Sequence, residues 1–365
     1  MVSESSPTDL ERRDAFVEQI GAAATGAFEL AAMAIGLRLG LYAALADGGP
    51  STAAELAGRT GTAERPIREW LEHGAVNGHL EVVGESDDPG TRRFALPAAH
   101  AEVLLDRDSL SYGGPTPPQA LAAIASLPLV LESFRTGTGF AFGDTGDDMR
   151  DGEAAANRPA YLGPLGREWL PSIADLHDRL LADPPARIAD VGCGLGWSSI
   201  GMARAYPRVS VDGLDLDEIS VGIARRNAED AGLGNRVRFV QGNAAAPGLT
   251  GGYDLVTMFE SFHDMSHPVE ILGSFRALLA PGGSILIVDL KAAETFTAPG
   301  DDLDRYLYGW SVLSCLHDGL QNGGVGTGTV MRPSTLQAYA REAGLATVEI
   351  VPIDHDHWRF YRLRP

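Results

Sequence analysis

The stretch ARIADVGCGLGWSSIGMARAYP, residues 186–207, limits the fold more than any other part of the chain. An apolar strand, RIADV, runs into Gly192, Gly194 and Gly196, and a helix begins near Ser198. The glycines let the backbone turn sharply and approach a ligand closely, and the helix N-terminus offers free N–H groups. A glycine pattern alone is weak evidence. Strand, glycine loop and helix in this order predict the first unit of an open α/β sheet.

The segments that follow continue the alternation of strand and helix. The glycine spacing is G-x-G-x-G, which differs from the dinucleotide pattern G-x-G-x-x-G. The next strand, RVSVDGLDLD, contains Asp215, whose carboxylate can accept hydrogen bonds from two ribose hydroxyls, and Leu216 can pack on an adenine face. Further strands are expected at RVRFVQGNA, YDLVTMF and SILIVDL. No helix separates ATVEIVPI from HWRFYRLRP, so these two are expected to pair antiparallel at one edge.

The chain divides into three regions, residues 1–108, 109–183 and 184–365. In the first, AFELAAMAIGLRLGLYAALAD has apolar residues on nearly every face, which suits a helix buried on several sides, for instance against a second subunit. Ser51 or Thr52 then caps a helix whose Glu55 completes a capping box. A second helix and two short strands follow, which is the winged-helix order. The middle region is expected to be irregular and then helical, as a linker or lid and a substrate-covering segment. Its stretch ESFRTGTGFAFGDTGDDMRDGEAAANRP mixes glycines, aromatics and charges and is expected to be a lid or a long surface loop.

Charge and composition exclude several classes of protein. The net charge of −20 argues against a phosphate-rich partner such as a nucleic acid, which is bound by clustered Lys and Arg. The helix AERPIREWLEH, where a winged helix would contact bases, has more acids than arginines. We find no run of about 18 uncharged apolar residues and no apolar segment of a secretion signal. With two cysteines in apolar or glycine-rich surroundings, a reduced, cytoplasmic protein is expected.

The motifs ADVGCGLG, VDGLDLD, GNA and LLAPGGSILIVD, in this order, resemble those of class I S-adenosylmethionine-dependent methyltransferases. The resemblance covers residues 184–365 and implies a Rossmann-like, seven-stranded sheet with a reversed terminal strand. The preceding region is similar to the winged-helix dimerisation domain of plant-type small-molecule O-methyltransferases and their bacterial relatives. The resemblance therefore implies a homodimeric enzyme that binds S-adenosylmethionine and methylates a small molecule.

By position, the same resemblance implies which residues hold the cofactor. Gly192, Gly194 and Gly196 line its methionine portion, and Asp190 lies near its amino group. Asn243 stands where the family commonly has an Asp beside the adenine amino group, and an Asn carbonyl can still accept that hydrogen bond. The full set expected to contact the cofactor is Asp190, Gly192, Gly194, Gly196, Asp215, Leu216, Asn243, Ala244, Phe259 and Glu260.

His263 is the candidate catalytic residue. It follows the strand YDLVTMF at the sheet edge where ligands bind, and FHDMSHP resembles the HDW sequence whose histidine deprotonates the acceptor in plant-type enzymes. A reference pKa of about 6.5 suits a neutral imidazole to that task. Asp264 either orients the ring or faces solvent. Two alternatives to the catalytic base stay open. In one, His263 has no chemical role. In the other, His263 and His317 share a metal, which resembles the iron site of 2-oxo acid C-methyltransferases.

The acceptor pocket is expected to use Trp169, Tyr306, Trp310 and His317, while Phe140 and Phe142 close over the cofactor. Aromatic walls suit an aromatic or polyketide-like acceptor. Besides O-methylation with His263 as base, three hypotheses remain. The first is the iron-dependent C-methyltransferase, the second a cofactor-sensing winged-helix regulator, and the third a methyltransferase scaffold adapted to other chemistry.

Overall fold

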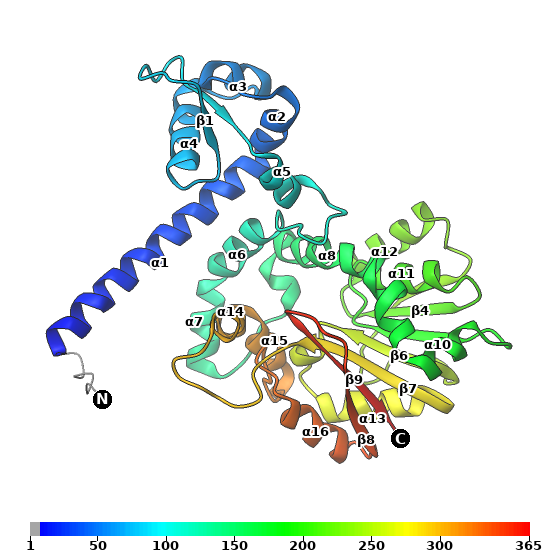
Figure 1. Ribbon diagram of the computed structural model, residues 1–365. Helices are drawn as coiled ribbons and strands as arrows, with labels where there is room; N and C mark the ends of the chain where they lie inside the picture. Colours follow the sequence, from blue (N-terminus) through cyan, green and yellow to red (C-terminus); the bar gives the residue numbers. More distant parts are fainter. Residues whose placement is uncertain (1–7) are drawn as a thin grey trace, which may run out of the picture. The chain divides into compact units, whose positions relative to one another are not determined.

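The computed structural model describes residues 8–365, which form two compact units, one ending at Leu121 and the other spanning Ala122–Pro365 (Figure 1). The sequence suggested three regions. Residues 109–183 do not form a unit of their own, because their helices beyond residue 121 are part of the C-terminal unit. Residues 1–7, which belong to the stretch where no secretion signal was expected, lie outside the described residues.

The N-terminal unit is helical and carries a two-stranded wing. Its elements are α1 (Asp9–Arg38), α2 (Leu41–Gly48), α3 (Ala53–Thr60), α4 (Glu64–Val76), β1 (Glu81–Val83), β2 (Arg93–Ala95) and α5 (Ala98–Leu105). The strands are antiparallel, with Val82 opposite Phe94. Phe94 packs in one apolar core with Leu56 of α3 and Leu71 of α4. The predicted winged-helix order is confirmed.

Helix α3 begins with the expected capping box, and the cap is Thr52. The Glu55 backbone N–H donates to Thr52 Oγ1 at 3.2 Å, and the Thr52 N–H donates to the Glu55 carboxylate at 3.0 Å. These bonds satisfy two N–H groups that have no partner inside the helix. Local sequence therefore sets this boundary.

Helix α1 is long, apolar and mostly exposed (Figure 1). The expected continuous helix breaks after Arg38, because Gly40 adopts a left-handed conformation with φ of 66° and α2 begins at Leu41. Helix α1 contains an 18-residue stretch with at most two charged residues and is long and apolar enough to cross a membrane. Only 11% of that stretch is buried. A single such helix near the N-terminus is weak evidence for a membrane span.

The C-terminal unit is built on a seven-stranded sheet in the order β5-β4-β3-β6-β7-β9-β8. The strands are β3 (Arg187–Val191), β4 (Ser210–Asp215), β5 (Val237–Gln241), β6 (Tyr253–Phe259), β7 (Leu279–Leu290), β8 (Thr347–Val351) and β9 (Trp358–Arg364). The strands β5, β4, β3, β6 and β7 are parallel, and β9 is antiparallel to both β7 and β8. The predicted seven-stranded sheet with a reversed strand is confirmed.

Helices cover both faces of this sheet and bury a separate apolar core on each. They are α10 (Ala174–Leu181), α11 (Trp197–Ala205) and α12 (Glu218–Asp230) for one core, and α13 (Pro268–Leu278) and α16 (Pro333–Glu342) for the other. Both faces of a parallel sheet must be covered in this way. Because β3, β4, β6 and β7 are parallel, their C-terminal ends share one edge of the sheet, and the candidate site lies there.

The remaining elements are helical. They are α6 (Thr116–Ala125, across the boundary of the two units), α7 (Leu127–Thr136), η1 (Phe142–Thr145), α8 (Asp147–Leu162), η2 (Leu165–Trp169), α9 (Leu170–Ser172), η3 (Phe262–Asp264), α14 (Asp302–Trp310), η4 (Ser311–Cys315), α15 (Leu316–Gly319) and η5 (Gln321–Gly323).

Most of the segment expected to be a lid or loop is helical. Helix α8 packs closely on α11, where a Cβ at Gly201 would lie 2.0 Å from the Tyr161 carbonyl oxygen. The glycine-rich part before α8 is tied to α15: the Phe142 N–H donates to Asp318 Oδ1 at 3.0 Å, and Phe140 stacks on His317 at 5.0 Å. Tertiary contacts therefore order a segment whose composition suggested irregular structure.

Candidate active site

The loop after β3 is held against the end of β4. The Gly192 and Cys193 N–H groups donate to the Leu214 carbonyl at 2.8 and 3.1 Å, and the Gly194 N–H donates to Asp215 Oδ2 at 2.8 Å. Gly192 has a φ of 68°, and a Cβ there would lie 2.5 Å from Ser261 Oγ. Residue 192 therefore has to be glycine for two separate reasons, its conformation and its space.

Asp190 is fully buried at the end of β3, and three hydroxyl groups bind its carboxylate. Ser198 and Ser199 donate to Oδ2, both at 2.6 Å, and Thr257 donates to Oδ1 at 2.8 Å. Burial raises the pKa of Asp190, and the hydroxyl groups oppose that shift. Asp190 thus joins β3, α11 and β6, and its predicted contact with the cofactor amino group stays a prediction.

The residues expected around ribose and adenine lie at the ends of β4 and β5. Each oxygen of Asp215 accepts one backbone N–H, from Gly194 and from Asp217, and each keeps a lone pair for a hydroxyl donor. Leu216 is 68% exposed and offers an apolar face. Asn243 is exposed beside Ala244, and its Oδ1 accepts the Ala245 N–H at 2.8 Å. Their cofactor roles stay predictions.

The end of β6 carries two buried polar atoms without a partner among the described residues, Oε2 of Glu260 and Oγ of Ser261. Glu260 is also unusual in its backbone, with a φ of +50°. Non-glycine residues rarely adopt this conformation, and it often marks a functional position. Burial, followed by the neighbouring Glu153, raises the pKa of Glu260 well above its ordinary value. Phe259, by contrast, is buried and packs on Tyr161 at 5.4 Å.

His263 is buried in the turn after β6 and is fixed by Asp289 of β7. Its Nδ1 lies 2.7 Å from Asp289 Oδ1, and its backbone N–H donates to Oδ2 of the same carboxylate at 3.1 Å. Its Nε2 lies 3.3 Å from Oδ1 of Asp264, so Asp264 faces the ring. Sequence reasoning missed Asp289, although it stands at the end of the quoted strand SILIVDL.

The carboxylates control the charge of this histidine. Burial alone would lower the pKa of His263, but Asp264 and Asp289 together raise the pKa well above its ordinary value. Burial raises the pKa of Asp264 to about 7, although the charge of His263 opposes that shift. Around neutral pH, protons are therefore held within this cluster.

The structure does not bring His317 to His263 as a second metal ligand. The Nδ1 of His317 lies 2.8 Å from Ser133 Oγ, and its Nε2 lies 2.8 Å from the Val312 carbonyl oxygen. Within residues 8–365, the group of three potential metal-binding side chains whose ligand atoms lie within 4.8 Å of one another is His263, Asp264 and Cys315. His317 instead connects α7, η4 and α15, and its expected place in the acceptor pocket stays a prediction.

The aromatic candidates separate into core and surface. Trp169 is buried and packs edge-on against Trp358 and Phe360 at 5.4 and 5.1 Å, so it supports β9, and its contact with the acceptor stays a prediction. Tyr306 on α14 is 51% exposed, and its ring lies 6.0 Å from that of Trp310. Tyr306 and Trp310 remain candidates for acceptor contact.

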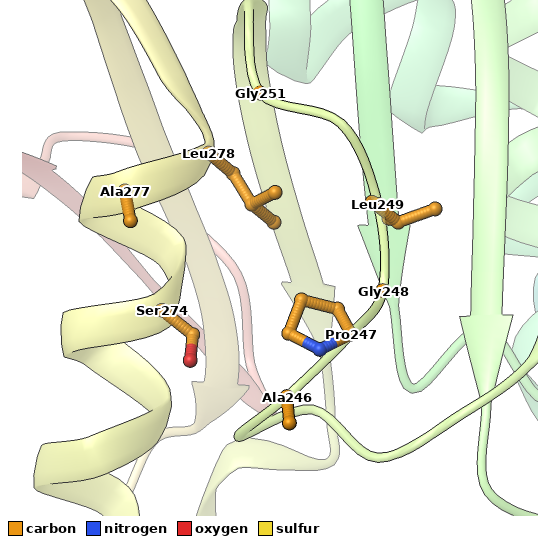
Figure 2. Close-up of a pocket in the computed structure, with 8 residues that line it drawn as sticks. All are labelled: Ala246, Pro247, Gly248, Leu249, Gly251, Ser274, Ala277 and Leu278. Atoms are coloured by element: carbon orange, nitrogen blue, oxygen red, sulfur yellow. The ribbon is translucent and has the colours of Figure 1, made fainter.

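One pocket lies away from the site around His263. Its volume is about 380 Å³, and it lies between α13 and the segment that leads into β6 (Figure 2). Its lining residues are Ala246, Pro247, Gly248, Leu249, Gly251, Ser274, Ala277 and Leu278. No titratable side chain lines it, whereas His263 follows the opposite end of β6. We therefore base no function on this pocket.

Together, the sheet order, the glycine loop, the acid that ends β4 and the reversed β9 define a class I methyltransferase fold. A family model described as a methyltransferase domain matches residues 167–350, about half of the chain. A second, described as an Rv2258c-like winged HTH domain, matches residues 27–106. The chain belongs to the methyltransferase domain family and is an S-adenosylmethionine-dependent methyltransferase with an N-terminal winged-helix domain.

Individual relatives agree with this assignment. The ubiquinone biosynthesis O-methyltransferase of Burkholderia pseudomallei is 29% identical over 189 residues, which cover 52% of this chain and 74% of the relative. The solved mitomycin 7-O-methyltransferase has a TM-score of 0.70 at 22% identity and covers 97% of this chain and 98% of its own. Human N-acetylserotonin methyltransferase, solved with S-adenosylmethionine, has a TM-score of 0.66 at 15% identity, covering 99% of both chains. At these identities the solved structures show the fold.

The residues at the sheet edge fit S-adenosylmethionine. The ligand carries an ammonium and a sulfonium group, and the end of β6 offers the buried, unpartnered oxygens of Glu260 and Ser261. The bare backbone at Gly192 and Gly194 allows close approach, since a Cβ at Gly194 would meet no atom within 4 Å. The chemistry of these groups matches a cationic ligand, because carboxylates bind cations through charge-assisted hydrogen bonds.

Proposed function

We propose that this methyltransferase transfers its methyl group to a hydroxyl of a small molecule, with His263 as the general base and Asp289 as the residue that orients it. The observation that carries the proposal is the 2.7 Å contact between His263 Nδ1 and Asp289 Oδ1 at the edge of the sheet beside the glycine loop. Several relatives support the choice of oxygen, because they are named O-methyltransferases.

The residues have separate tasks. The bound cofactor supplies a methyl group that is already electrophilic, so the protein mainly has to align the acceptor and take up a proton. Asp289 holds Nδ1 and directs Nε2 to the side of the ring where Asp264 lies. The neutral imidazole accepts the hydroxyl proton at Nε2, and the two carboxylates stabilise the imidazolium that forms.

The alternatives are less well supported. An iron site built from His263 and His317 is not favoured, because protein groups lie at hydrogen-bonding distance from both ring nitrogens of His317. A DNA-binding regulator is not favoured either. On α4, Arg65 is paired with Glu69 and Arg68 with Glu64, at 2.5 and 2.6 Å, which neutralises both cations.

The direct test is a panel of phenols and hydroxylated aromatic compounds with cofactor labelled in the methyl group. Replacing the base in His263→Ala should lower kcat roughly 10²- to 10⁴-fold. Affinity for S-adenosylhomocysteine, measured by calorimetry, should change little. His357→Ala, at an exposed position, is the matched control. Full turnover in His263→Ala would exclude the base role.

We also propose that the enzyme is a homodimer joined through its N-terminal domain and resides in the cytoplasm. The exposed apolar side chains of α1, which include Phe16, Ile20 and Phe28, support the first proposal. Two free cysteines, Cys193 and Cys315, are compatible with the second. The domain limits 1–108, 109–183 and 184–365 remain our division by sequence, with residues 122–183 serving the C-terminal unit.

A further inference from the structure

Two carboxylates are candidates for binding the ammonium group of the cofactor's methionine portion. The strand order β4-β3-β6 places the glycine loop between Asp215, the expected ribose ligand, and Glu260. If Asp215 holds the ribose, the glycine loop and the turn after β6 would receive the methionine portion, because β3 lies between β4 and β6. Asp190 at β3 and Glu260 after β6 are both within this region.

The hydrogen bonds of Asp190 argue against it. Its two oxygens already accept three hydroxyl groups, and its side chain is fully buried beneath the loop. Three of its roughly four acceptor positions are therefore occupied, which leaves an ammonium group a single position, on the buried Oδ1. Asp190 therefore serves to hold Ser198, Ser199 and Thr257 in place.

Glu260 is in the opposite situation. Its Oε2 is buried and lacks a hydrogen-bond partner among residues 8–365, as does Oγ of the adjacent Ser261. Ser261 lies against the glycine loop, because its Oγ is the atom that a Cβ on Gly192 would meet. Buried polar atoms of this kind are costly unless a ligand satisfies them. The unsatisfied atoms thus lie beside the glycine loop, which is expected to line the cofactor.

Helix α8 places more polar groups beside Glu260. Glu153 and Asn157 are one helical turn apart, and Asn157 Nδ2 donates to Glu153 Oε1 at 2.8 Å. The charge of Glu153 raises the pKa of Glu260, and a hydrogen bond with the Asn157 side chain opposes that shift. Two partly buried carboxylates and an amide together form a site for a cationic hydrogen-bond donor.

We infer that Glu260, and not Asp190, receives the methionine ammonium of S-adenosylmethionine, with Glu153 as the neighbouring carboxylate. The inference rests on the cofactor and not on the proposed hydroxyl acceptor or on His263. Glu153 of α8 and Glu260, which follows β6, would thus make the site specific for the amino group of the ligand.

Proton release is a consequence of this arrangement. Burial and the charge of Glu153 raise the pKa of Glu260 well above its ordinary value, which favours the protonated carboxyl in the free enzyme. An arriving ammonium keeps its own protons and favours the Glu260 carboxylate, so the proton of Glu260 leaves to solvent. The titratable groups that face Glu260 are Glu153 and Tyr161 of α8, His263 of η3, Asp289 of β7 and Tyr306 of α14.

The test compares S-adenosylhomocysteine with its deamino analogue, which keeps the carboxylate, by calorimetry on the full chain. The wild type should bind S-adenosylhomocysteine roughly 10- to 100-fold more tightly than the analogue, as expected for a hydrogen bond between charged groups. Glu260→Gln should remove most of this difference. Glu270→Gln, an exposed acid on α13, should preserve it.

Titrations at pH 7 in phosphate and in Tris separate the proton release from the binding enthalpy. Release with S-adenosylhomocysteine but not with the deamino analogue is expected in the wild type, and this result does not require a folded variant. Equal affinity of the wild type for both ligands, or a preference that Glu260→Gln retains, would overturn the inference. His263→Ala should retain the preference, so failure of the proposed base leaves this result unchanged.

Discussion

At the scale of single residues, the turn after β6 and the end of β7 determine the proton chemistry. His263 lies between Asp289 at Nδ1 and Asp264 at Nε2, with contacts of 2.7 and 3.3 Å. Burial would favour a neutral ring, yet the two carboxylates raise the pKa of His263 well above its ordinary value. Since a general base must be neutral, activity should increase as pH rises through that raised pKa.

Removal of the Asp264 charge should shift the dependence of activity on pH. In Asp264→Asn, one of the two charges that favour imidazolium is lost, so the pKa of His263 falls. The acidic limb of kcat/KM against pH should move to lower pH by about one pH unit or more. Asp302→Asn, which removes an exposed carboxylate from α14, should leave the profile in place. An unchanged limb in Asp264→Asn would mean that His263 does not set the profile.

At the scale of elements, the glycine loop depends on the close approach of β3 to the end of β6. Ala at position 192 would need a φ near 68° and would place its Cβ 2.5 Å from Ser261 Oγ. We expect Gly192→Ala to cost on the order of 1–3 kcal/mol in local strain. Since the strain falls on the cofactor loop, the affinity for S-adenosylhomocysteine should drop.

Gly273 is the matched control for that substitution. It lies inside α13, and a Cβ there meets nothing within 4 Å. Gly273→Ala should therefore stabilise the fold by roughly 0.5–1 kcal/mol, because alanine loses less backbone entropy in a helix. Thermal unfolding and calorimetry distinguish the two variants. A Gly192→Ala enzyme with normal ligand affinity would contradict the role given to the loop.

At the scale of the whole molecule, the exposed apolar side chains of α1 predict association. Phe16, Val17, Ile20 and Phe28 are each more than half exposed, and burying such side chains contributes roughly 1.5–3 kcal/mol apiece. Light scattering should give twice the chain mass of 38.6 kDa for the wild type. Ile20→Glu would bury a charge in the contact and should yield monomers.

Gln19→Glu adds the same charge at the neighbouring exposed position and should leave the dimer intact if Ile20 lies in the contact. A monomeric wild type at micromolar concentration would refute association through α1. Equal dissociation by both substitutions would indicate a general effect of charge and not a defined face.

The class of fold follows from local sequence. RIADV and YDLVTMF coincide with β3 and β6, because continuous apolar runs of this length bounded by glycine, polar or turn residues form buried parallel strands. Thr52 and Glu55 likewise set the start of α3 through bonds between near neighbours. These features depend on contacts within a few residues, and the chain alone predicts them.

The chemistry of the site depends on contacts between distant segments. Asp289 of β7 contacts His263 in the turn after the neighbouring strand β6, and Glu153 of α8 affects Glu260 from more than a hundred residues away. No periodicity encodes such pairs, so Asp289, Glu153 and Ser261 were not predicted, and neither were the interior contacts of His317 and Trp169. Residue type and position along a strand predict where a ligand binds, but which polar groups remain unsatisfied there is decided only when the chain has folded and buried them.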